Sequence, residues 1–593
     1  MQLQVQAPVP APTVDPAPQA RDSYAVTALS DITDRSVHAA LARFTLGLSP
    51  AALTAAYFDW AVHLAASPGK RMQLLDKAAR KALRFANHTR HVAVEGAACP
   101  ACIEPLPQDR RFSAEAWHQW PFNLLYQSFL LQQQWWHNAT TGVRGVTSHH
   151  EAVVSFTARQ LLDMVSPSNF LLTNPELLKH TVEHGGINLV NGLQLWMEDW
   201  ERAVSGKKPI GTEAWRVGHE VAASPGRVVL RNRLIELIQY APTTDTVRPE
   251  PILMVPAWIM KYYILDLSPH NSLVKYLTDQ GFTVFMISWK NPGAEDRDLG
   301  MEDYRQLGII AALDAIGAIV PERQVHALGY CLGGTLLSIA AAAMARDNDR
   351  RLATLTLLAA QTDFSEAGEL TLFIDDSQLA FLEDMMWEQG FLDARQMAGA
   401  FQILRSNDLI WSQSLHRYLR GERAPLSDMM AWNADATRMP YRMHSEYLRW
   451  LFLNNDLAEG RYLADGRPVA LSDIHVPIFA VGTEWDHVAP WRSTHKIHLL
   501  TDTEVRYLLT SGGHNAGIVS EPGRDGRHYR VMTRPMEGRY VDPQTWQATA
   551  QLHEGSWWPE LSAWLAERSG TPAEPPPFGP SFGDTPGLYV LES

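Results

Sequence analysis

The sequence has little cysteine and no long hydrophobic run, and each shortage excludes a class of protein. Only three of the 593 residues are cysteine, which is too few for a disulfide framework and is typical of a reducing compartment. No stretch approaches the roughly 18 apolar residues of a membrane-spanning helix. The stretch before Asp15, the first charged residue, has neither the basic start nor the apolar core of a secretion signal. We therefore expect a cytoplasmic protein.

Positive charge is scarce as well. Lys and Arg number 51 against 65 Asp and Glu, which makes a net charge of −14, and no concentrated basic block occurs. This balance argues against a general surface for nucleic acid or anionic membrane, so we predict no nucleic-acid partner. The rest of the composition, with 46% hydrophobic and 20% charged residues, is that of an ordinary globular protein with a sizeable core.

The first part of the chain has the pattern of a tail followed by helices. Residues 1–22 are rich in Pro and Ala and are expected to form a disordered tail. Residues 23–225 are predicted to form a mainly helical domain, because apolar residues recur at steps of three and four, as in Phe122, Leu125 and Phe129. This domain has no cluster of catalytic residues, so we expect it to serve assembly and surface attachment.

Residues 226–570 are predicted to form an α/β domain. Residues 227–242 have the pattern of an antiparallel strand pair, and buried-strand patterns then alternate with helical patterns. This alternation predicts βαβ units around a mostly parallel sheet. It pauses over residues 363–475, which show no buried strand and are interpreted as an inserted cap. Residues 571–593 are rich in Pro and Gly and are expected to form a loosely attached tail.

The strongest chemical motif is Gly329-Tyr330-Cys331-Leu332-Gly333-Gly334, between a predicted buried strand and an Ala-rich helix. This is the setting of a nucleophile elbow, with cysteine in place of the serine of hydrolases. The tight turn needs small residues two positions before and after the nucleophile, and Gly329 and Gly333 supply them. The N-terminus of the following helix favours the thiolate form of Cys331. The alternative is a buried structural cysteine beside packing glycines.

An elbow also predicts an acid and then a histidine, each after a later strand. Asp486 and His514 follow predicted strands in that order, and His514 lies in a Gly-lined loop. Glu484 is the rival acid, and a simple turn or loop is the alternative explanation for Asp486 and His514. His487, beside the acid, is either a supporting residue of this triad or a structural one.

Two further clusters give weaker signals. Cys99 and Cys102 form an isolated CxxC, without a second pair at zinc spacing or a thioredoxin-like βαβ unit. His149-His150 lacks companion ligands and is interpreted as part of a solvated loop. We therefore predict no metal site and no cofactor. The 20 tryptophans are mostly expected in the core, although some are candidates for contact with an apolar polymer or lipid surface.

With these residues the sequence resembles the polyhydroxyalkanoate synthases, above all the class I type that makes short-chain polyesters. The resemblance runs from Asp109 to about residue 565. Besides the elbow at 329–334, it rests on motifs that follow one another in the family's order. They are Lys261-Tyr262-Tyr263-Ile264-Leu265-Asp266-Leu267, Ile287-Ser288-Trp289-Lys290-Asn291-Pro292, Asn407-Asp408-Leu409-Ile410-Trp411, Trp432-Asn433-Ala434-Asp435-Ala436-Thr437, Asp486-His487 and Ser556-Trp557-Trp558.

The resemblance implies an α/β-hydrolase fold with a cap, and an acyltransferase that joins (R)-3-hydroxyacyl-CoA thioesters into polyester with release of CoA. Cys331, Asp486 and His514 occupy the family's catalytic positions: Cys331 is acylated, His514 takes its proton and Asp486 orients the imidazole. Either His514 or Asp486 then deprotonates the 3-hydroxyl of the next acyl unit. The resemblance also implies a homodimer, attachment to polymer granules and contact with granule-coating proteins.

The loop around Trp258 departs from the family pattern. Residues 255–261 read Val-Pro-Ala-Trp-Ile-Met-Lys where the family commonly has Val-Pro-Pro-x-Ile-Asn-Lys. Ser406 replaces a usual proline, and the histidine loop reads Ser-Gly-Gly-His-Asn-Ala-Gly instead of Ser-Gly-His-x-x-Gly. We expect the N–H of Leu332 and one from near Trp258 to hold the oxyanion. The class I resemblance implies acyl chains of about three to five carbons, and Trp258 is expected to crowd longer ones.

Two other functions fit parts of this pattern. A cysteine thioesterase or a dienelactone-hydrolase-like enzyme has the same triad and releases free acid instead of polyester. A non-catalytic granule-coating protein uses its tryptophans to bind polymer and carries a vestigial triad. The intact triad argues against the second of these.

Overall fold

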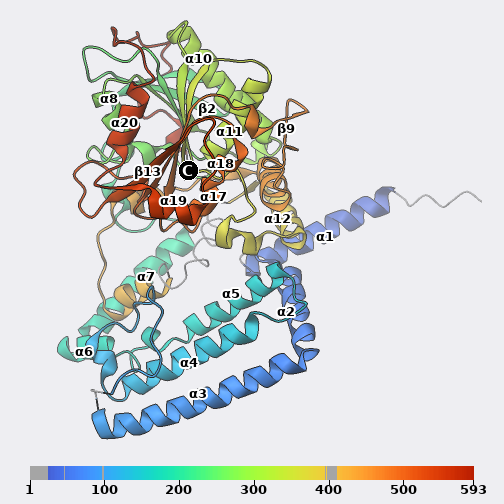
Figure 1. The fold of residues 1–593 in the computed structure, drawn as a ribbon, viewed down its shortest axis with the longest axis vertical. Coiled ribbons are helices and arrows are strands. Elements are labelled where there is room, and N and C mark those ends of the chain that lie inside the picture. The colour runs from blue at the N-terminus through green and yellow to red at the C-terminus, as the bar shows by residue number, and fades with distance from the viewer. Residues whose placement is uncertain (1–23, 46, 97–98, 394–395, 397–409, 593) are drawn as a thin grey trace, which may run out of the picture.

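The computed structural model describes residues 24–45, 47–96, 99–393, 396 and 410–592. Three features from the sequence lie outside these residues: the tail at 1–22, the replacement at Ser406 and most of the motif that begins at Asn407. The described chain forms a region of long helices and an α/β region around one sheet (Figure 1).

The N-terminal region is mainly helical, as the sequence predicts. Ser49 starts one helix by accepting a hydrogen bond from Ala52 N–H, with Pro50 in the first turn. Figure 1 shows α3, α4 and α5 side by side below the α/β region. Among the described residues, no helix is both long and apolar enough to cross a membrane. The helices are α1 (Tyr24–Thr45), α2 (Pro50–Ala65), α3 (Pro68–Glu95), α4 (Phe122–Thr140), α5 (Ser148–Met164), α6 (Pro175–Glu183) and α7 (Ile187–Ser205).

The α/β region is organised around a sheet with the strand order β1-β2-β4-β3-β5-β6-β11-β12-β13-β14. The predicted strand pair is present as β1 and β2, which are antiparallel, and the strands from β4 to β12 in this order are parallel neighbours. The predicted α/β class is therefore confirmed. The strands are β1 (Gly226–Arg231), β2 (Ile235–Tyr240), β3 (Ile252–Val255), β4 (Val284–Trp289), β5 (Val325–Tyr330), β6 (Leu352–Leu358), β11 (Ile478–Thr483), β12 (Val505–Thr510), β13 (His528–Arg534) and β14 (Gln551–Glu554).

The last two strands are not predicted from the sequence. β13 pairs antiparallel with β12, and β14 pairs antiparallel with β13. Most side chains of β13 are only half-buried and most of β14 are exposed. These two strands at the end of the sheet therefore lack the continuous apolar run that marks the fully buried parallel strands.

Helices cover both faces of the sheet. α8 and α20 lie together on one face, where the rings of Tyr276 and Trp558 are 5.5 Å apart between centroids, and α10 and α11 lie on the other (Figure 1). The helices of this region are α8 (Leu273–Asp279), α9 (Met301–Asp303), α10 (Ala311–Ile319), α11 (Leu332–Arg346), α17 (Trp491–His495), α18 (Ile497–Leu500), α19 (Pro543–Thr549) and α20 (Trp558–Ala566), with the π-helix η7 (Tyr304–Ile310) before α10.

The segment that we interpret as the cap leaves the sheet after β6 and returns at β11, and these two strands are parallel neighbours. It is mainly helical, but it also contains two antiparallel pairs of two-residue strands that the sequence does not reveal: β7 (Phe391–Leu392) with β8 (Met439–Pro440), and β9 (Leu463–Ala464) with β10 (Arg467–Pro468). Its helices are η8 (Gly368–Phe373), α12 (Asp376–Gln389), α14 (Ser412–Ser414), η10 (Leu415–Leu419), α15 (Asp428–Asn433), α16 (Tyr441–Tyr447) and η11 (Leu448–Leu453).

The N-terminal helices contact the cap at several places. α1 runs along α12 (Figure 1), and His38 Nδ1 lies 2.7 Å from Asp384 Oδ2. Further along the chain, Asp199 of α7 accepts hydrogen bonds from Arg417 at 3.0 Å and Arg423 at 2.8 Å. The helical region is therefore tied to the cap by buried or half-buried ion pairs.

The C-terminal residues 571–592 differ from the expected loose tail. Val228 N–H donates to the Gly583 carbonyl at 2.8 Å, and the buried carboxylate of Glu236 accepts from the Leu588 N–H at 2.8 Å. β1 is an edge strand, so its backbone groups are open for pairing, and this segment covers them. A Pro- and Gly-rich composition did not reveal this, because the contacts are made mainly by the backbone.

Candidate active site

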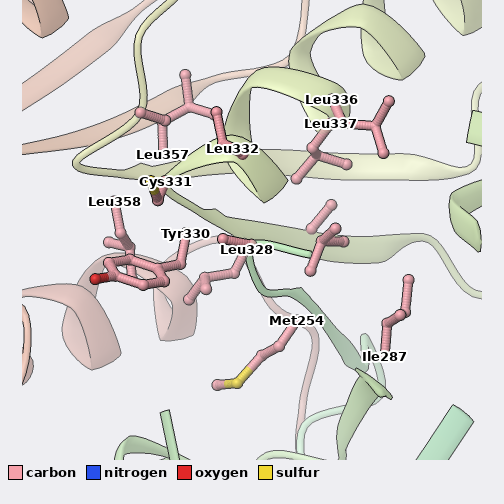
Figure 2. Packing of buried hydrophobic residues seen from close by; sticks show 14 of the residues in the cluster. Met254, Ile287, Leu328, Tyr330, Cys331, Leu332, Leu336, Leu337, Leu357 and Leu358 are labelled. Atoms are coloured by element: carbon pink, nitrogen blue, oxygen red, sulfur yellow. The ribbon is translucent and has the colours of Figure 1, made fainter. Parts of the chain in front are cut away.

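Cys331 lies at the sharp turn between β5 and α11 (Figure 2). Its backbone has φ 52° and ψ −125°, a conformation that L-amino acids rarely adopt, and its N–H donates to the Leu358 carbonyl at 2.9 Å. A Cβ atom at Gly333 would lie 2.1 Å from the Val255 carbonyl oxygen, and one at Gly329 would lie 2.4 Å from the Cα atom of Gly334. Both positions therefore require glycine, as the elbow pattern predicts.

Asp486 follows β11 and is held by hydrogen bonds on both carboxylate oxygens. Oδ1 accepts from the N–H groups of Val488 at 2.9 Å and Ala489 at 2.7 Å. Oδ2 accepts from Thr483 Oγ1 at 2.9 Å and from His514 Nδ1 at 2.8 Å. The side chain is 0% exposed, so this carboxylate faces protein groups on all sides.

His514 follows β12 and connects Asp486 to Cys331. Besides the contact with Asp486, its imidazole is close enough to the Cys331 thiol for the charge of that group to act on it. Its ring centroid lies 5.6 Å from that of Tyr330, and the Tyr330 hydroxyl donates to Asn515 Oδ1 at 2.6 Å. The structure thus brings together the three residues that the sequence selects.

The charges of these three residues act on one another. Burial alone would lower the pKa of His514, but attraction to Asp486 and Cys331, with the hydrogen bond to Asp486, raises it well above its usual value. Burial would also raise the pKa of Asp486, yet the charge of His514 and the hydrogen bonds hold it below its usual value. Such an arrangement can take a proton from a thiol and stabilise the resulting imidazolium.

Glu484 and His487 lie outside this hydrogen-bonded set. Glu484 Oε1 lies 3.3 Å from His528 Nε2, so the rival acid is paired with another histidine. His487 is exposed, and among the described residues no hydrogen bond or ion pair involves its imidazole. The structure therefore gives His487 no contact that would support the triad.

The N–H of Leu332 and an N–H from near Trp258 are the two backbone groups expected to hold an oxyanion. Leu332 is the first residue of α11, where helix N–H groups have no intrahelical partner, and it lines the same cavity as Cys331. Trp258 does not have the expected side-chain position. Its ring is buried against Tyr304 and Tyr447, with centroids 5.6 and 6.1 Å away, and its neighbour Ile259 lines the cavity instead.

A largely apolar cavity of about 130 Å³ lies between Cys331 and the cap. Its walls come from η8, α12, α16 and η11, and they include the buried His444, which the sequence analysis did not select. Two residues of the N-terminal region, Gly47 and Leu48, complete the lining. The expectation that this region only serves assembly is therefore incomplete, because it contributes to the wall of the site.

A buried side chain of the cap makes two hydrogen bonds to this N-terminal loop. Gln378 of α12 donates from Nε2 to the Gly47 carbonyl at 2.6 Å, and its Oε1 accepts from Ser49 N–H at 2.8 Å. Gln378 is buried and itself lines the cavity. The contact joins residues more than 300 positions apart, so no local pattern could have predicted it.

Comparisons with known proteins agree with the fold. Residues 28–70 match the family model "Poly-beta-hydroxybutyrate polymerase N terminal", residues 108–277 match "Poly-beta-hydroxybutyrate polymerase (PhaC) N-terminus", and residues 250–520 match "alpha/beta hydrolase fold". The chain is 42% identical over 504 residues to a poly(3-hydroxyalkanoate) polymerase of Methylorubrum extorquens, covering 84% of this chain and 83% of that protein. A poly(3-hydroxyalkanoate) polymerase subunit PhaC of Cupriavidus necator is 35% identical over 494 residues, covering 81% and 83%.

The chain belongs to the poly(3-hydroxyalkanoate) polymerase family. This confirms the resemblance, the α/β-hydrolase fold and the prediction of an acyltransferase-type enzyme. Among solved structures, a monoacylglycerol lipase of Paleococcus ferrophilus covers 56% of this chain and 99% of its own, at 12% identity and a TM-score of 0.31. A likeness this weak carries no argument about the chemistry.

One motif shared with the polymerase family supports the histidine loop. Trp557 Nε1 donates to the Gly517 carbonyl at 2.9 Å, and Trp558 Nε1 donates to the Ile518 carbonyl at 3.0 Å. Both indoles are buried, so each N–H needs such a partner. These tryptophans are therefore core residues that fix the loop after His514, and they do not form a surface for polymer.

Two other family motifs support the loop beside the elbow. Trp289 Nε1 donates to the Pro256 carbonyl at 2.9 Å, and Thr437 Oγ1 donates to the Trp258 carbonyl at 2.6 Å. Trp432 Nε1 donates to the Lys261 carbonyl at 2.8 Å. These contacts could not be predicted from the motifs alone, because the partners come from distant segments.

The two weaker clusters make contacts within the N-terminal region. Cys99 Sγ lies 3.7 Å from His88 Nδ1 and 3.6 Å from the Pro100 carbonyl oxygen. In the part of the chain that the structure describes, no three His, Cys, Asp or Glu residues are placed to hold a metal. His149-His150 lies in the first turn of α5 and not in a loop, and His150 Nδ1 is 2.6 Å from Asp59 Oδ2.

Proposed function

We propose that this chain polymerises (R)-3-hydroxyacyl-CoA thioesters into a polyhydroxyalkanoate polyester and releases CoA. The observation that supports this most is the Cys331, His514 and Asp486 arrangement at the wall of an apolar cavity beneath the cap. A thiol suits a thioester substrate, since exchange between the two is nearly balanced in energy and keeps the acyl group activated. The names of the relatives support the same activity.

In the first step, Cys331 Sγ attacks the thioester carbonyl of the substrate. The new bond joins Sγ to the acyl carbon, the bond between that carbon and the CoA sulfur breaks, and the Cys331 proton passes through His514 to the leaving CoA thiolate. The N–H of Leu332 and one from the loop around Trp258 hold the oxyanion of the tetrahedral intermediate.

In the second step, the 3-hydroxyl of another acyl unit attacks the thioester on Cys331. An ester bond forms, the bond from the acyl carbon to Sγ breaks, and the hydroxyl proton passes to the sulfur. We assign the base to His514, because both oxygens of Asp486 are occupied by hydrogen bonds and its side chain is fully buried. His514 is 13% exposed and lies between Asp486 and the sulfur.

The burial of Cys331 beneath the cap favours transfer to an alcohol over hydrolysis. The cap and the loop that carries Gly47 and Leu48 cover the sulfur, and Cys331 is only 8% exposed. Excluding water protects the acyl-enzyme from hydrolysis. This feature supports a synthase over the thioesterase or dienelactone-hydrolase-like alternative.

We also propose that α7 attaches the enzyme to polymer granules. This helix presents apolar side chains to solvent along one stripe, and the rings of its two tryptophans stack with centroids 6.5 Å apart. Such an exposed stripe fits an apolar polymer surface. The implied homodimer and granule-coating partners stay predictions. The stripe consists of Ile187, Val190, Leu193, Trp196, Met197, Trp200 and Val204.

The test is incubation of the full chain with (R)-3-hydroxybutyryl-CoA, following CoA release and turbidity together. We expect both to rise, with polyester as the product, and neither to rise for a Cys331→Ala variant. CoA release in a clear solution that accumulates free 3-hydroxybutyrate would identify a hydrolase. If the wild type released no CoA, both the synthase and the hydrolase activity would be excluded.

A further inference from the structure

His444 is an unusual side chain in the wall of the active-site cavity. It belongs to α16 of the cap, is 3% exposed and lines the cavity that contains Cys331. Its ring centroid lies 6.0 Å from that of Tyr447, which lines the same cavity. Tyr447 is close enough to Cys331 that, after burial, the Cys331 charge is the next cause that raises the Tyr447 pKa. His444, Tyr447 and Cys331 therefore border the same cavity.

The ring nitrogens of His444 make no hydrogen bond to another described residue. Four other polar side chains of the lining, Thr335, Gln361, Gln378 and Gln396, each make hydrogen bonds within the protein. In contrast, Nδ1 of His444 is buried without a partner, and Nε2 is the ring nitrogen available to a group in the cavity. A buried polar group without a partner is costly, so a native structure that keeps one commonly has a use for it.

The imidazole of His444 is uncharged at neutral pH. Burial lowers its pKa to about 4. A neutral imidazole has one N–H donor and one nitrogen acceptor, and a hydroxyl group can serve as partner to either. An apolar cavity with one such imidazole thus matches an apolar acyl chain that carries one hydroxyl group.

We infer that His444 recognises the 3-hydroxyl group of the acyl chain at Cys331 and thereby selects hydroxyacyl thioesters over acyl thioesters that lack the hydroxyl. This inference rests on the proposed function. A hydroxylated chain gives the imidazole a partner inside the cavity. A chain without the hydroxyl leaves the imidazole unsatisfied, which is the situation in which protein sites reject a deoxy analogue most strongly.

The test compares (R)-3-hydroxybutyryl-CoA with butyryl-CoA, which differ only in the hydroxyl group. Single-turnover CoA release from the full chain is measured for the wild type and for His444→Phe, His444→Leu and His444→Gln. We expect the wild type to react about tenfold faster with the hydroxylated substrate, the size of effect that one hydrogen bond supplies. Phe and Leu should bring the ratio of the two rates close to one by slowing only the hydroxylated substrate, and Gln should keep most of the preference.

His495→Phe is the matched control. His495 is buried and has two unpartnered ring nitrogens, but it lies outside the cavity, so its replacement should leave the ratio of rates unchanged. If His444→Phe does not fold, as judged by circular dichroism, the Leu and Gln variants and the wild-type ratio still decide. An equal loss with both substrates, an unchanged ratio or a wild type without preference would overturn the role of His444. A wild type that releases CoA from neither thioester would overturn the proposed function and this inference with it.

Discussion

The catalytic core and the cap border the same cavity, but they are held by different contacts. In the core, Cys331, Asp486 and His514 each follow a buried strand of one sheet, and Asp486 is fixed by backbone and side-chain hydrogen bonds within a few residues of its own position. In the cap, Gln378 holds part of the cavity wall. Its side-chain amide makes hydrogen bonds to Gly47 and Ser49, which are 331 and 329 positions away in the sequence. The reactive groups are thus set locally, and the shape of the cavity is set by few long-range contacts.

This difference implies two kinds of mutational effect. A change in the core should remove the chemistry, because it removes a reacting group or its immediate support. A change in the cap or in the N-terminal loop should leave the chemistry in place and alter which molecules reach it, water included.

The largest effect is expected for Cys331→Ala, which should lower CoA release by a factor of about 10⁴ or more, because the nucleophile is lost. The matched control is the Cys99→Ala/Cys102→Ala double variant, which should keep nearly full activity because both thiols lie in the N-terminal region. Iodoacetamide labelling with peptide mapping identifies the reactive cysteine. Substantial activity in Cys331→Ala would contradict the assignment.

The next largest effect is expected at the other two triad positions. His514→Gln should lower the rate of acylation by about 10³, because it removes the proton acceptor. Asp486→Asn should leave a slow burst of CoA release, because it removes only the charge that orients and stabilises His514. Rapid-quench measurement with labelled substrate separates the two variants. Normal bursts in both would exclude these roles.

The same pair of residues predicts a dependence of stability on pH. The folded-state pKa of His514 is raised, so its contribution to stability is present below its unfolded pKa and is lost as pH rises through the folded value. Asp486 has a lowered pKa, so its contribution is present above its unfolded pKa and is lost as pH falls through the folded value. Asp486→Asn should therefore flatten the alkaline fall of Tm relative to the wild type. Parallel Tm curves for the two proteins would argue against this coupling.

The sequence is enough to place the core, and the reasons are physical. A parallel sheet buries its strands on both faces, so each strand appears as an apolar run, and the reactive loops follow such runs directly. The edge strands β13 and β14 and the covering segment 571–592 escape prediction because they are held through backbone pairing at the sheet edges. The roles of Gln378 and His444 escape it because they depend on which distant segments meet. Trp258 was expected at the pocket because it lies beside the proposed oxyanion donor, but its large indole is buried in the core.

A smaller effect, of severalfold, is expected from Gln378→Leu. The substitution leaves the Gly47 carbonyl and the Ser49 N–H without their partner and loosens the loop that covers the cavity. Water should then reach the acyl-enzyme more often, so the share of acyl groups released as free acid should rise. The product ratio of acid to polyester measures this.

The control for this change is Gln324→Leu. Gln324 also donates its amide to two backbone carbonyls, those of Arg350 and Leu352, but it lies away from the cavity. It should leave the product ratio unchanged. If both variants gave the product ratio of the wild type, the N-terminal loop would have no part in excluding water from the acyl-enzyme.

The smallest effect concerns acyl chain length, and it tests which residue of the loop beside the elbow borders the substrate. The family's class I resemblance leads us to expect a higher kcat/KM for hydroxybutyryl than for hydroxydecanoyl thioesters. Ile259 lines the cavity, so Ile259→Ala should narrow this gap by a few fold, since each methylene that gains room contributes about 0.8 kcal/mol when buried. Trp258→Phe should lower Tm without changing the gap, because the indole packs behind the wall against Tyr304 and Tyr447. If the difference in kcat/KM responds to Trp258→Phe and not to Ile259→Ala, the loop turns its other face to the substrate. A wild-type preference for the ten-carbon substrate would overturn the short-chain assignment while leaving the triad chemistry in place.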